Sequence, residues 1–301
     1  MIVKNVEELL KSVKAGDFKS LARTITLVEN ELDGYEQILL SLKSNSNTPV
    51  IGITGPPGAG KSTLINSLLK ILVEKNKRIA VAAVDPTSPF NFGSLLGDRL
   101  RLSEFFNHPN VFIRSLASRG SLGGLSEKLI EVIDILKQGT FDYIFVETVG
   151  VGQSEVEIAG LADTTLVVVV PESGDDIQAM KSGIMEIADI FVVNKCDREG
   201  AERLAMNLLN SGREKKGWKV PVVKTSAINR EGIEELEKLI ENHSGSGATN
   251  EKKIFLLAEK AFRLLQRERM KGISKKEIQD VIMKDVNNPN FNLYRFVKEL
   301  A

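Results

Sequence analysis

Gly55-Pro56-Pro57-Gly58-Ala59-Gly60-Lys61-Ser62-Thr63 is the stretch that decides the fold of this 301-residue chain. An apolar run precedes it and a helical pattern follows it, so a G-x-x-x-x-G-K-S motif joins a strand to a helix. The glycines let successive N–H groups and the helix N-terminus converge on phosphate oxygens. We expect Lys61 to contact the β- and γ-phosphates and the Ser62 hydroxyl to ligate Mg²⁺. A plain Gly/Pro turn would need neither side chain, so the sequence predicts a nucleotide-binding loop.

Seven apolar runs of strand length alternate with amphipathic helical stretches between Val50 and about Asn242. The runs are Val50–Ile53, Ile79–Val84, Val111–Ile113, Tyr143–Val146, Thr165–Val170, Ile190–Val193 and Val220–Val223. Most of them are continuously apolar, as strands covered on both faces must be. The sequence therefore predicts an α/β fold, with a mostly parallel sheet flanked by helices. Ligands of such sheets bind at the carboxyl ends of the strands, so the residues after each run are candidate site residues.

Helical patterns without strands flank this region on both sides. We expect an N-terminal helical extension at residues 1–47, the nucleotide-binding domain at 48–243 and a C-terminal helical extension at 250–301, behind a Gly/Ser-rich linker. The N-terminal helices either cap the core or embrace a partner. For the C-terminal extension the alternatives are a cap on the sheet and a surface that joins two copies, and we favour the homodimer.

Composition limits the partners and the compartment. Lys and Arg together number 40, and so do Asp and Glu, so no global charge draws the chain to nucleic acid or to an anionic membrane. Cys196 is the single cysteine, which excludes an intramolecular disulfide and fits a reducing compartment. The sequence shows neither an apolar signal core near its start nor a stretch of membrane-spanning length. We expect a soluble cytoplasmic protein with no nucleic-acid or membrane partner.

Acidic residues follow two of the predicted strands. Asp85 follows the second run and Glu147 follows the fourth, so both are candidates to hold Mg²⁺ or a metal-bound water beside the phosphate loop. Asp85 precedes a proline, and its alternative role is a turn carboxylate. Asp98 is a further candidate metal ligand.

The residues after the third and fourth runs predict switch loops. Residues 114–125 combine two arginines with three glycines, and either Arg114 or Arg119 is a candidate to stabilise charge on the transferring phosphoryl group. Surface solubility explains either arginine equally well. After Glu147, the N–H of Gly150 is placed to meet the γ-phosphate, and Val151 stands where a Ras-like enzyme has its glutamine. We therefore predict slow intrinsic hydrolysis, with Gln153 as an alternative water-positioning group.

The last two runs lead into a base-recognition pattern. Asn194-Lys195-Cys196-Asp197 follows the sixth run, and Ser226-Ala227-Ile228 lies just after the seventh. An aspartate at 197 accepts two hydrogen bonds from N1–H and the 2-amino group of guanine, which adenine does not offer in that arrangement. We expect Asn194 to reach N7, the Lys195 stem to lie along the base, and backbone N–H groups around Ala227 to meet O6. The pattern predicts GTP and GDP as ligands.

These motifs together resemble the MeaB/ArgK family of phosphate-loop GTPases. The resemblance covers nearly the whole chain, including residues 16–29, 147–153 and 174–181. It implies a SIMIBI-type G domain in a homodimeric chaperone of adenosylcobalamin-dependent acyl-CoA mutases, chiefly methylmalonyl-CoA mutase. Such a chaperone gates cofactor loading, protects the mutase from inactivation and uses GTP hydrolysis as a timer. The resemblance also implies that Lys181 completes the catalytic site in the complex.

Three rival functions remain open at this point. One is an ATP/GTP-dependent kinase of a lysine/arginine/ornithine transport system, against which the Asn194–Asp197 pattern argues. Another is a metal-delivery GTPase, which usually carries Cys or His ligands near its switches, whereas this chain has one cysteine and two unclustered histidines. The third is a nucleotide-sensing scaffold that scarcely turns over.

Overall fold

The computed structural model describes residues 6–43, 47–85, 99–117, 128–148, 158–173, 184–215, 217–245, 250–270, 272–285 and 291–300. They belong to two compact units, Met1–Lys253 and Ile254–Ala301. Asp98, Arg119, Gly150, Gln153 and Lys181 lie outside the described residues.

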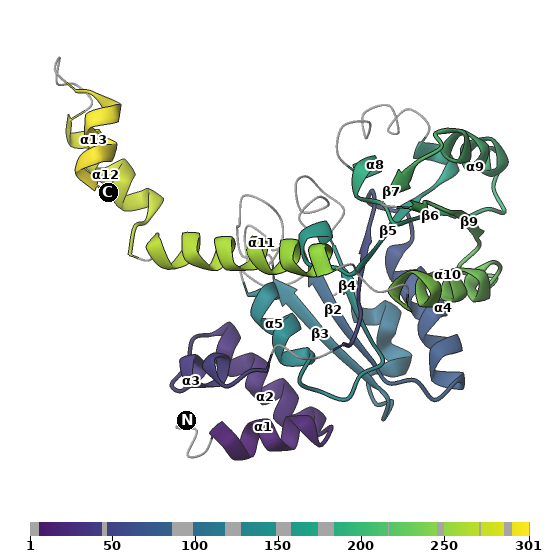
Figure 1. The fold of residues 1–301 in the computed structure, drawn as a ribbon, viewed down its shortest axis with the longest axis horizontal. Helices are drawn as coiled ribbons and strands as arrows, with labels where there is room; N and C mark the ends of the chain where they lie inside the picture. Colours follow the sequence, from purple (N-terminus) through teal and green to yellow (C-terminus); the bar gives the residue numbers. More distant parts are fainter. Residues whose placement is uncertain are drawn as a thin grey trace. The chain divides into compact units, whose positions relative to one another are not determined.

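A seven-stranded sheet with the order β3-β2-β4-β1-β5-β6-β9 forms the centre of the first unit (Figure 1). Its strands are β1 (Val50–Thr54), β2 (Ile79–Asp85), β3 (Val111–Ala117), β4 (Tyr143–Glu147), β5 (Thr164–Val169), β6 (Ile190–Asn194) and β9 (Val222–Thr225). Every neighbouring pair is parallel. The predicted α/β fold with a mostly parallel sheet is therefore confirmed.

Helices cover both faces of this sheet (Figure 1). The helices over one face include α1 (Val6–Lys14), α2 (Phe18–Glu29), α3 (Tyr35–Leu40) and α5 (Leu129–Leu136), and those over the other include η1 (Arg99–Phe105), α4 (Lys61–Glu74) and α10 (Ile233–Gly245). Val50 of β1 packs into the first layer, whereas Ile51 and Ile53 pack into the second, and all three are fully buried. Burial of alternate residues on opposite faces is why the strands read as continuous apolar runs.

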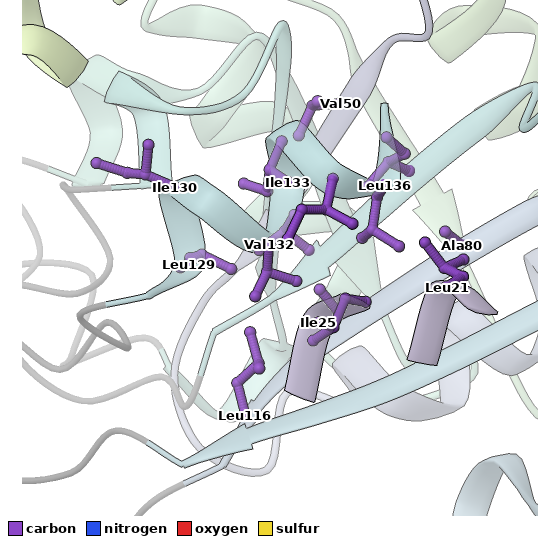
Figure 2. Close-up of a cluster of buried hydrophobic side chains, with 14 of the residues drawn as sticks. Leu21, Ile25, Val50, Ala80, Leu116, Leu129, Ile130, Val132, Ile133 and Leu136 are labelled. Carbon is purple, nitrogen blue, oxygen red and sulfur yellow. The ribbon is translucent and has the colours of Figure 1, made fainter. Parts of the chain in front are cut away.

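Helices α2 and α5 pack together over the strands in a cluster of buried side chains (Figure 2). Leu21 and Ile25 of α2 belong to this cluster with Val132 and Ile133 of α5, and all four have no more than 2% of their surface exposed. Burying such an aliphatic side chain contributes roughly 1.5–3 kcal/mol. The apolar stripe that predicted an N-terminal helix is thus used within the chain's own core.

The turn between α1 and α2 is fixed by polar contacts. Asp17 caps α2 and accepts from the backbone N–H of Ser20 at 2.8 Å. Behind it, a guanidinium nitrogen of Arg78 donates to the Gly16 carbonyl at 3.1 Å, and the Arg78 guanidinium lies 5.3 Å from the Phe18 ring centroid. These contacts join the N-terminal helices to the start of β2.

The far half of the sheet packs against α8 (Ile184–Ile187) and α9 (Ala201–Asn210). A short antiparallel hairpin of β7 (Glu214–Lys215) and β8 (Trp218–Lys219) precedes β9, and the sequence did not predict it. The Trp218 indole donates to the Asp189 carbonyl at 2.8 Å and packs against the His243 ring, with 4.8 Å between centroids. His243 lies in α10, and its Nδ1 contacts Thr164 Oγ1 at 2.8 Å.

The second unit is helical. It contains most of α11 (Asn250–Arg269), followed by α12 (Lys275–Asp285) and α13 (Leu293–Leu300). Ser274 and Glu277 form a reciprocal capping box at the start of α12, with bonds of 3.0 and 3.1 Å. The described stretches include no helix that combines the length and the apolar character needed to cross a bilayer.

Candidate nucleotide site

Strand pairing brings the phosphate loop and Glu147 to one edge of the sheet. Ile53 of β1 pairs with Glu147 of β4, and the next residue, Thr54, lies 3.1 Å from Thr148 through their hydroxyl oxygens. The loop therefore leaves β1 beside the carboxylate that ends β4. This is the edge where ligands of parallel sheets bind.

Two glycines of the loop occupy positions that a larger residue could not. Gly55 has φ 142°, and a Cβ there would lie 2.0 Å from the Val168 carbonyl oxygen. Gly60 has φ 86°, and a Cβ there would lie 2.5 Å from Asn194 Nδ2. The loop thus turns back tightly against β5 and against the end of β6, and α4 begins at the next residue, Lys61.

Lys61 is held over its own loop. Its side chain is buried, and Nζ donates to the carbonyls of Gly55 at 2.8 Å and Pro56 at 3.1 Å. An ammonium group fixed among main-chain groups at a helix N-terminus presents positive charge where phosphate oxygens bind. This geometry is consistent with the phosphate-binding role predicted for Lys61.

Ser62 and Glu147 meet across 85 residues of sequence. The Ser62 hydroxyl donates to Glu147 Oε1 at 2.7 Å, and both residues are buried, with 4% and 8% of their surface exposed. A hydroxyl and a carboxylate are oxygen ligands of the kind that Mg²⁺ prefers. The two predicted metal ligands therefore lie together, and their chemistry fits that ion.

Asp85, another of the predicted metal ligands, lies at the end of a strand that pairs with β4. Asp85 ends β2, two residues beyond Ala83, whose pairing partner is Glu147. The Asp85 backbone thus lies at the same edge of the sheet, while its side chain falls outside the described atoms. The metal roles of Asp85 and Asp98 and the catalytic role of Lys181 stay predictions.

Asn194 joins the phosphate loop to the base-recognition segment. It is buried at the end of β6, and its Nδ2 donates to the Ala59 carbonyl at 2.8 Å. Its Oδ1 accepts from the Thr225 hydroxyl and the Ala227 N–H, both at 3.2 Å. We expected Asn194 to reach N7 of the base, and sequence reasoning missed this bridging role.

Asp197 is oriented by Ser226. The Ser226 hydroxyl donates to Asp197 Oδ1 at 2.8 Å, and this bond holds the pKa of the carboxyl below its ordinary value. Asp197 is therefore ionised at neutral pH and presents an acceptor, as recognition of N1–H and the 2-amino group requires. Lys195, with φ 57°, turns the backbone between Asn194 and Asp197.

Ser67 is a polar residue of this site that sequence reasoning did not single out. It lies on α4, is buried, and donates its hydroxyl hydrogen to the Ala227 carbonyl at 2.6 Å. A serine inside a helical pattern carries no local signal of such a contact. Ile228, the last residue of the predicted base-recognition pattern, is 85% exposed, whereas Ser67 is buried.

Arg114 does not lie in a loop, as we had expected. Strand β3 continues past Ile113 to Ala117, and the Arg114 guanidinium contacts Glu29 Oε2 at 2.5 Å and Thr26 Oγ1 at 3.3 Å on α2. The sequence interpretation ended the strand at its first charged residue. The Glu29 carboxylate is what allows a charged side chain there.

Comparisons with known proteins identify the family of this chain. The family model described as methylmalonyl Co-A mutase-associated GTPase MeaB matches residues 21–283. The chain is 49% identical over 245 residues to a Pyrococcus horikoshii protein whose name classes it as a GTPase, covering 79% of this chain and 77% of that protein. It is 35% identical to the GTPase ArgK of Escherichia coli over 241 residues, covering 76% and 73% of the two chains. A crystal structure described as LAO/AO transport system kinase matches with a TM-score of 0.70 and 25% identity, covering 100% of this chain and 97% of that one.

Proposed function

This chain belongs to the MeaB family of methylmalonyl-CoA mutase-associated GTPases, and we propose that its GTP hydrolysis gates adenosylcobalamin loading into an acyl-CoA mutase and protects that mutase from inactivation. The chain is a GTPase, as its family and its relatives are. The observation that carries the site is the contact of 2.7 Å between Ser62 and Glu147, next to the loop that holds Lys61. The family's association with the mutase supports the partner.

In the proposed site, the main-chain N–H groups of the non-proline residues among 55–63 and the Lys61 ammonium bind the β- and γ-phosphates. The Lys61 ammonium donates to the Gly55 and Pro56 carbonyls. When a nucleotide binds, these hydrogen bonds are exchanged for hydrogen bonds to phosphate oxygens. This exchange makes the loop's charge available where negative charge develops during phosphoryl transfer.

Ser62, Glu147 and Asp85 would hold Mg²⁺ directly or through water, with Asp98 as a further candidate. When bound there, the ion would neutralise charge on the β- and γ-phosphates. Burial of Ser62 and Glu147 keeps their oxygens in a low-dielectric setting, where binding of a cation is strengthened. A buried carboxylate such as Glu147 needs a hydrogen-bond donor or a cation beside it, and the Ser62 hydroxyl is such a donor.

Guanine selectivity is assigned to Asp197. Ser226 holds the Asp197 carboxylate, and Asn194 joins the neighbouring Ala227 to the phosphate loop at Ala59, so the segments that read the base and the phosphates are connected. We further propose slow intrinsic hydrolysis, because Val151 occupies the place of a water-positioning glutamine. In this proposal Lys181 completes the site when the mutase binds.

The second unit is proposed to form the homodimer. Along α11, Ile254, Phe255, Leu257, Phe262 and Leu265 are each between 57% and 65% exposed. Exposed apolar side chains on an otherwise charged helix support association with a second copy.

Single-turnover GTP hydrolysis with and without an adenosylcobalamin-dependent mutase tests the proposal. We expect the mutase to accelerate hydrolysis by about tenfold or more, as other partners of GTPases do, and GTP to alter transfer of adenosylcobalamin to the mutase. A parallel series with ATP addresses the transport-kinase alternative. The mutase role is refuted if no methylmalonyl- or isobutyryl-type mutase changes the hydrolysis rate and none gains or loses cofactor with GTP.

A further inference from the structure

The hydroxyl of Ser67 makes an unusual contact for a helical serine. The helical hydroxyls of Ser12, Thr24, Thr26 and Ser244 donate to the carbonyl four residues earlier in their own helix, and the Ser62 hydroxyl donates to the Glu147 carboxylate of the phosphate site. Ser67 instead donates to the Ala227 carbonyl, 160 residues away, at 2.6 Å. Serine is also a poorer helix former than alanine, so local helix stability does not account for it.

The contact fixes the orientation of one peptide group. The Ala227 carbonyl and the Ile228 N–H belong to the same planar peptide, and the described part of the chain has no cis peptide bonds. In a trans peptide the carbonyl and the N–H point in opposite directions. Because Ser67 holds the carbonyl toward α4, the Ile228 N–H points away from α4.

The same loop is held at its neighbouring groups. The Ala227 N–H donates to Asn194 Oδ1, and the Ser226 hydroxyl donates to Asp197. Main-chain bonds between Ser226 and Glu231, of 3.1 and 3.2 Å, close the turn. The Ala227 N–H is therefore already engaged, which leaves the next N–H along the chain as the better placed donor for a ligand.

We propose that Ser67 is a positioning residue that orients the Ala227–Ile228 peptide so that the Ile228 N–H donates to O6 of guanine. This inference rests on the proposed guanine site at Asp197. It names Ile228 as the residue around Ala227 whose N–H meets O6 and assigns to Ser67 the orientation of that N–H. Asp197 recognises positions 1 and 2 of the purine, whereas the Ile228 N–H recognises position 6. Adenine carries an amino group at position 6, which would set a donor against this donor.

The test compares four diphosphates in competition binding. GDP has both O6 and the 2-amino group, IDP has O6 alone, 2-aminopurine riboside diphosphate has the 2-amino group alone, and ADP has neither. With Ser67→Ala we expect GDP and IDP to bind about threefold to tenfold more weakly, as for loss of one hydrogen bond. The other two ligands are expected to keep their wild-type affinity within about twofold. Ser67→Cys, with a weak S–H donor, is expected to fall between alanine and serine.

Thr24→Val is the matched control. Thr24 is fully buried and its hydroxyl also donates to a main-chain carbonyl, at 2.7 Å, but within α2. It is expected to leave all four affinities unchanged. A purely structural role for Ser67 would weaken all four diphosphates equally, and that result overturns the inference.

Two further outcomes separate this inference from the proposed function. If the wild type prefers GDP to ADP and Ser67→Ala keeps both affinities, the Ser67 assignment is overturned and the guanine site stands. If the wild type itself shows no preference for GDP, both the guanine site and the Ser67 assignment are wrong.

Discussion

Asn194→Ala removes the side chain that joins the phosphate loop to the base-recognition segment. The substitution deletes three hydrogen bonds, to the Ala59 carbonyl at 2.8 Å and from the Thr225 hydroxyl and the Ala227 N–H at 3.2 Å. Each buried bond contributes about 1 kcal/mol, and partners left unsatisfied add to the loss. We expect the free energy of unfolding to fall by about 2–4 kcal/mol.

Nucleotide binding should weaken in the same variant. Without Asn194 the two loops are no longer fixed relative to each other, so binding must order them. We expect GDP affinity to fall by at least about tenfold, which corresponds to about 1.4 kcal/mol.

Trp218 provides the assay for stability. It is the single tryptophan and lies in the first unit, packed against His243, so its fluorescence during denaturant unfolding reports on that unit alone. GDP affinity is measured separately by titration. Asn207→Ala, at an exposed position of α9, is the matched control and should change neither quantity. The reasoning is refuted if Asn194→Ala is as stable as Asn207→Ala, or if it loses stability but keeps its GDP affinity.

Three other substitutions probe separate parts of the account. Arg114→Ala breaks the ion pair between Arg114 and Glu29, whose side chains are 25% and 12% exposed, and should lower the free energy of unfolding by about 1–2 kcal/mol. Arg198→Ala breaks an ion pair with Glu172 in which both side chains are 50% exposed, and should lower it by at most about 0.5 kcal/mol. Equal losses in the two variants would contradict this. Asp17→Ala removes the N-cap of α2 and should lower the free energy of unfolding by about 1 kcal/mol at pH 7. The Ser20 side chain and N–H lower the pKa of Asp17 from 3.8, so the stabilisation is present above that pH and is lost as the pH falls through the lowered pKa; a mutant deficit that stays constant in acid would disprove the cap. Glu147→Gln should slow Mg²⁺-dependent single-turnover GTP hydrolysis by about 100-fold, while leaving metal-free GDP binding within about threefold; a rate unaffected by the substitution would remove Glu147 from the site.

Much of the fold could be predicted because its signals are local. Strands covered on both faces must be apolar at every position, so β1, β4, β5 and β6 appear directly as apolar runs. The phosphate loop was also predictable, since Gly60 and Lys61 stand at the offsets that its geometry demands. The carboxyl-edge rule then placed Glu147 beside that loop.

What the sequence did not reveal depends on partners far away in the chain. Arg114 lies within β3 because Glu29 of α2 faces it, and no local pattern indicates that pairing. Asn194 and Ser67 donate to the main-chain carbonyls of Ala59 and Ala227. Every residue has a main-chain carbonyl, so the sequence does not indicate which one accepts the bond. The packing of Trp218 against His243 likewise joins residues 25 positions apart, and no local pattern indicates it.

The central claim is that Asp197 selects guanine for a triphosphate held by the phosphate loop, and Asp197→Asn tests it most directly. Affinities for GDP and XDP are measured for the wild type and the variant by competition titration. We predict that the variant binds GDP about 100-fold more weakly and XDP more tightly, because the asparagine amide can donate to the 2-oxo group of xanthine. A variant that keeps the wild-type preference for GDP over XDP would contradict the account.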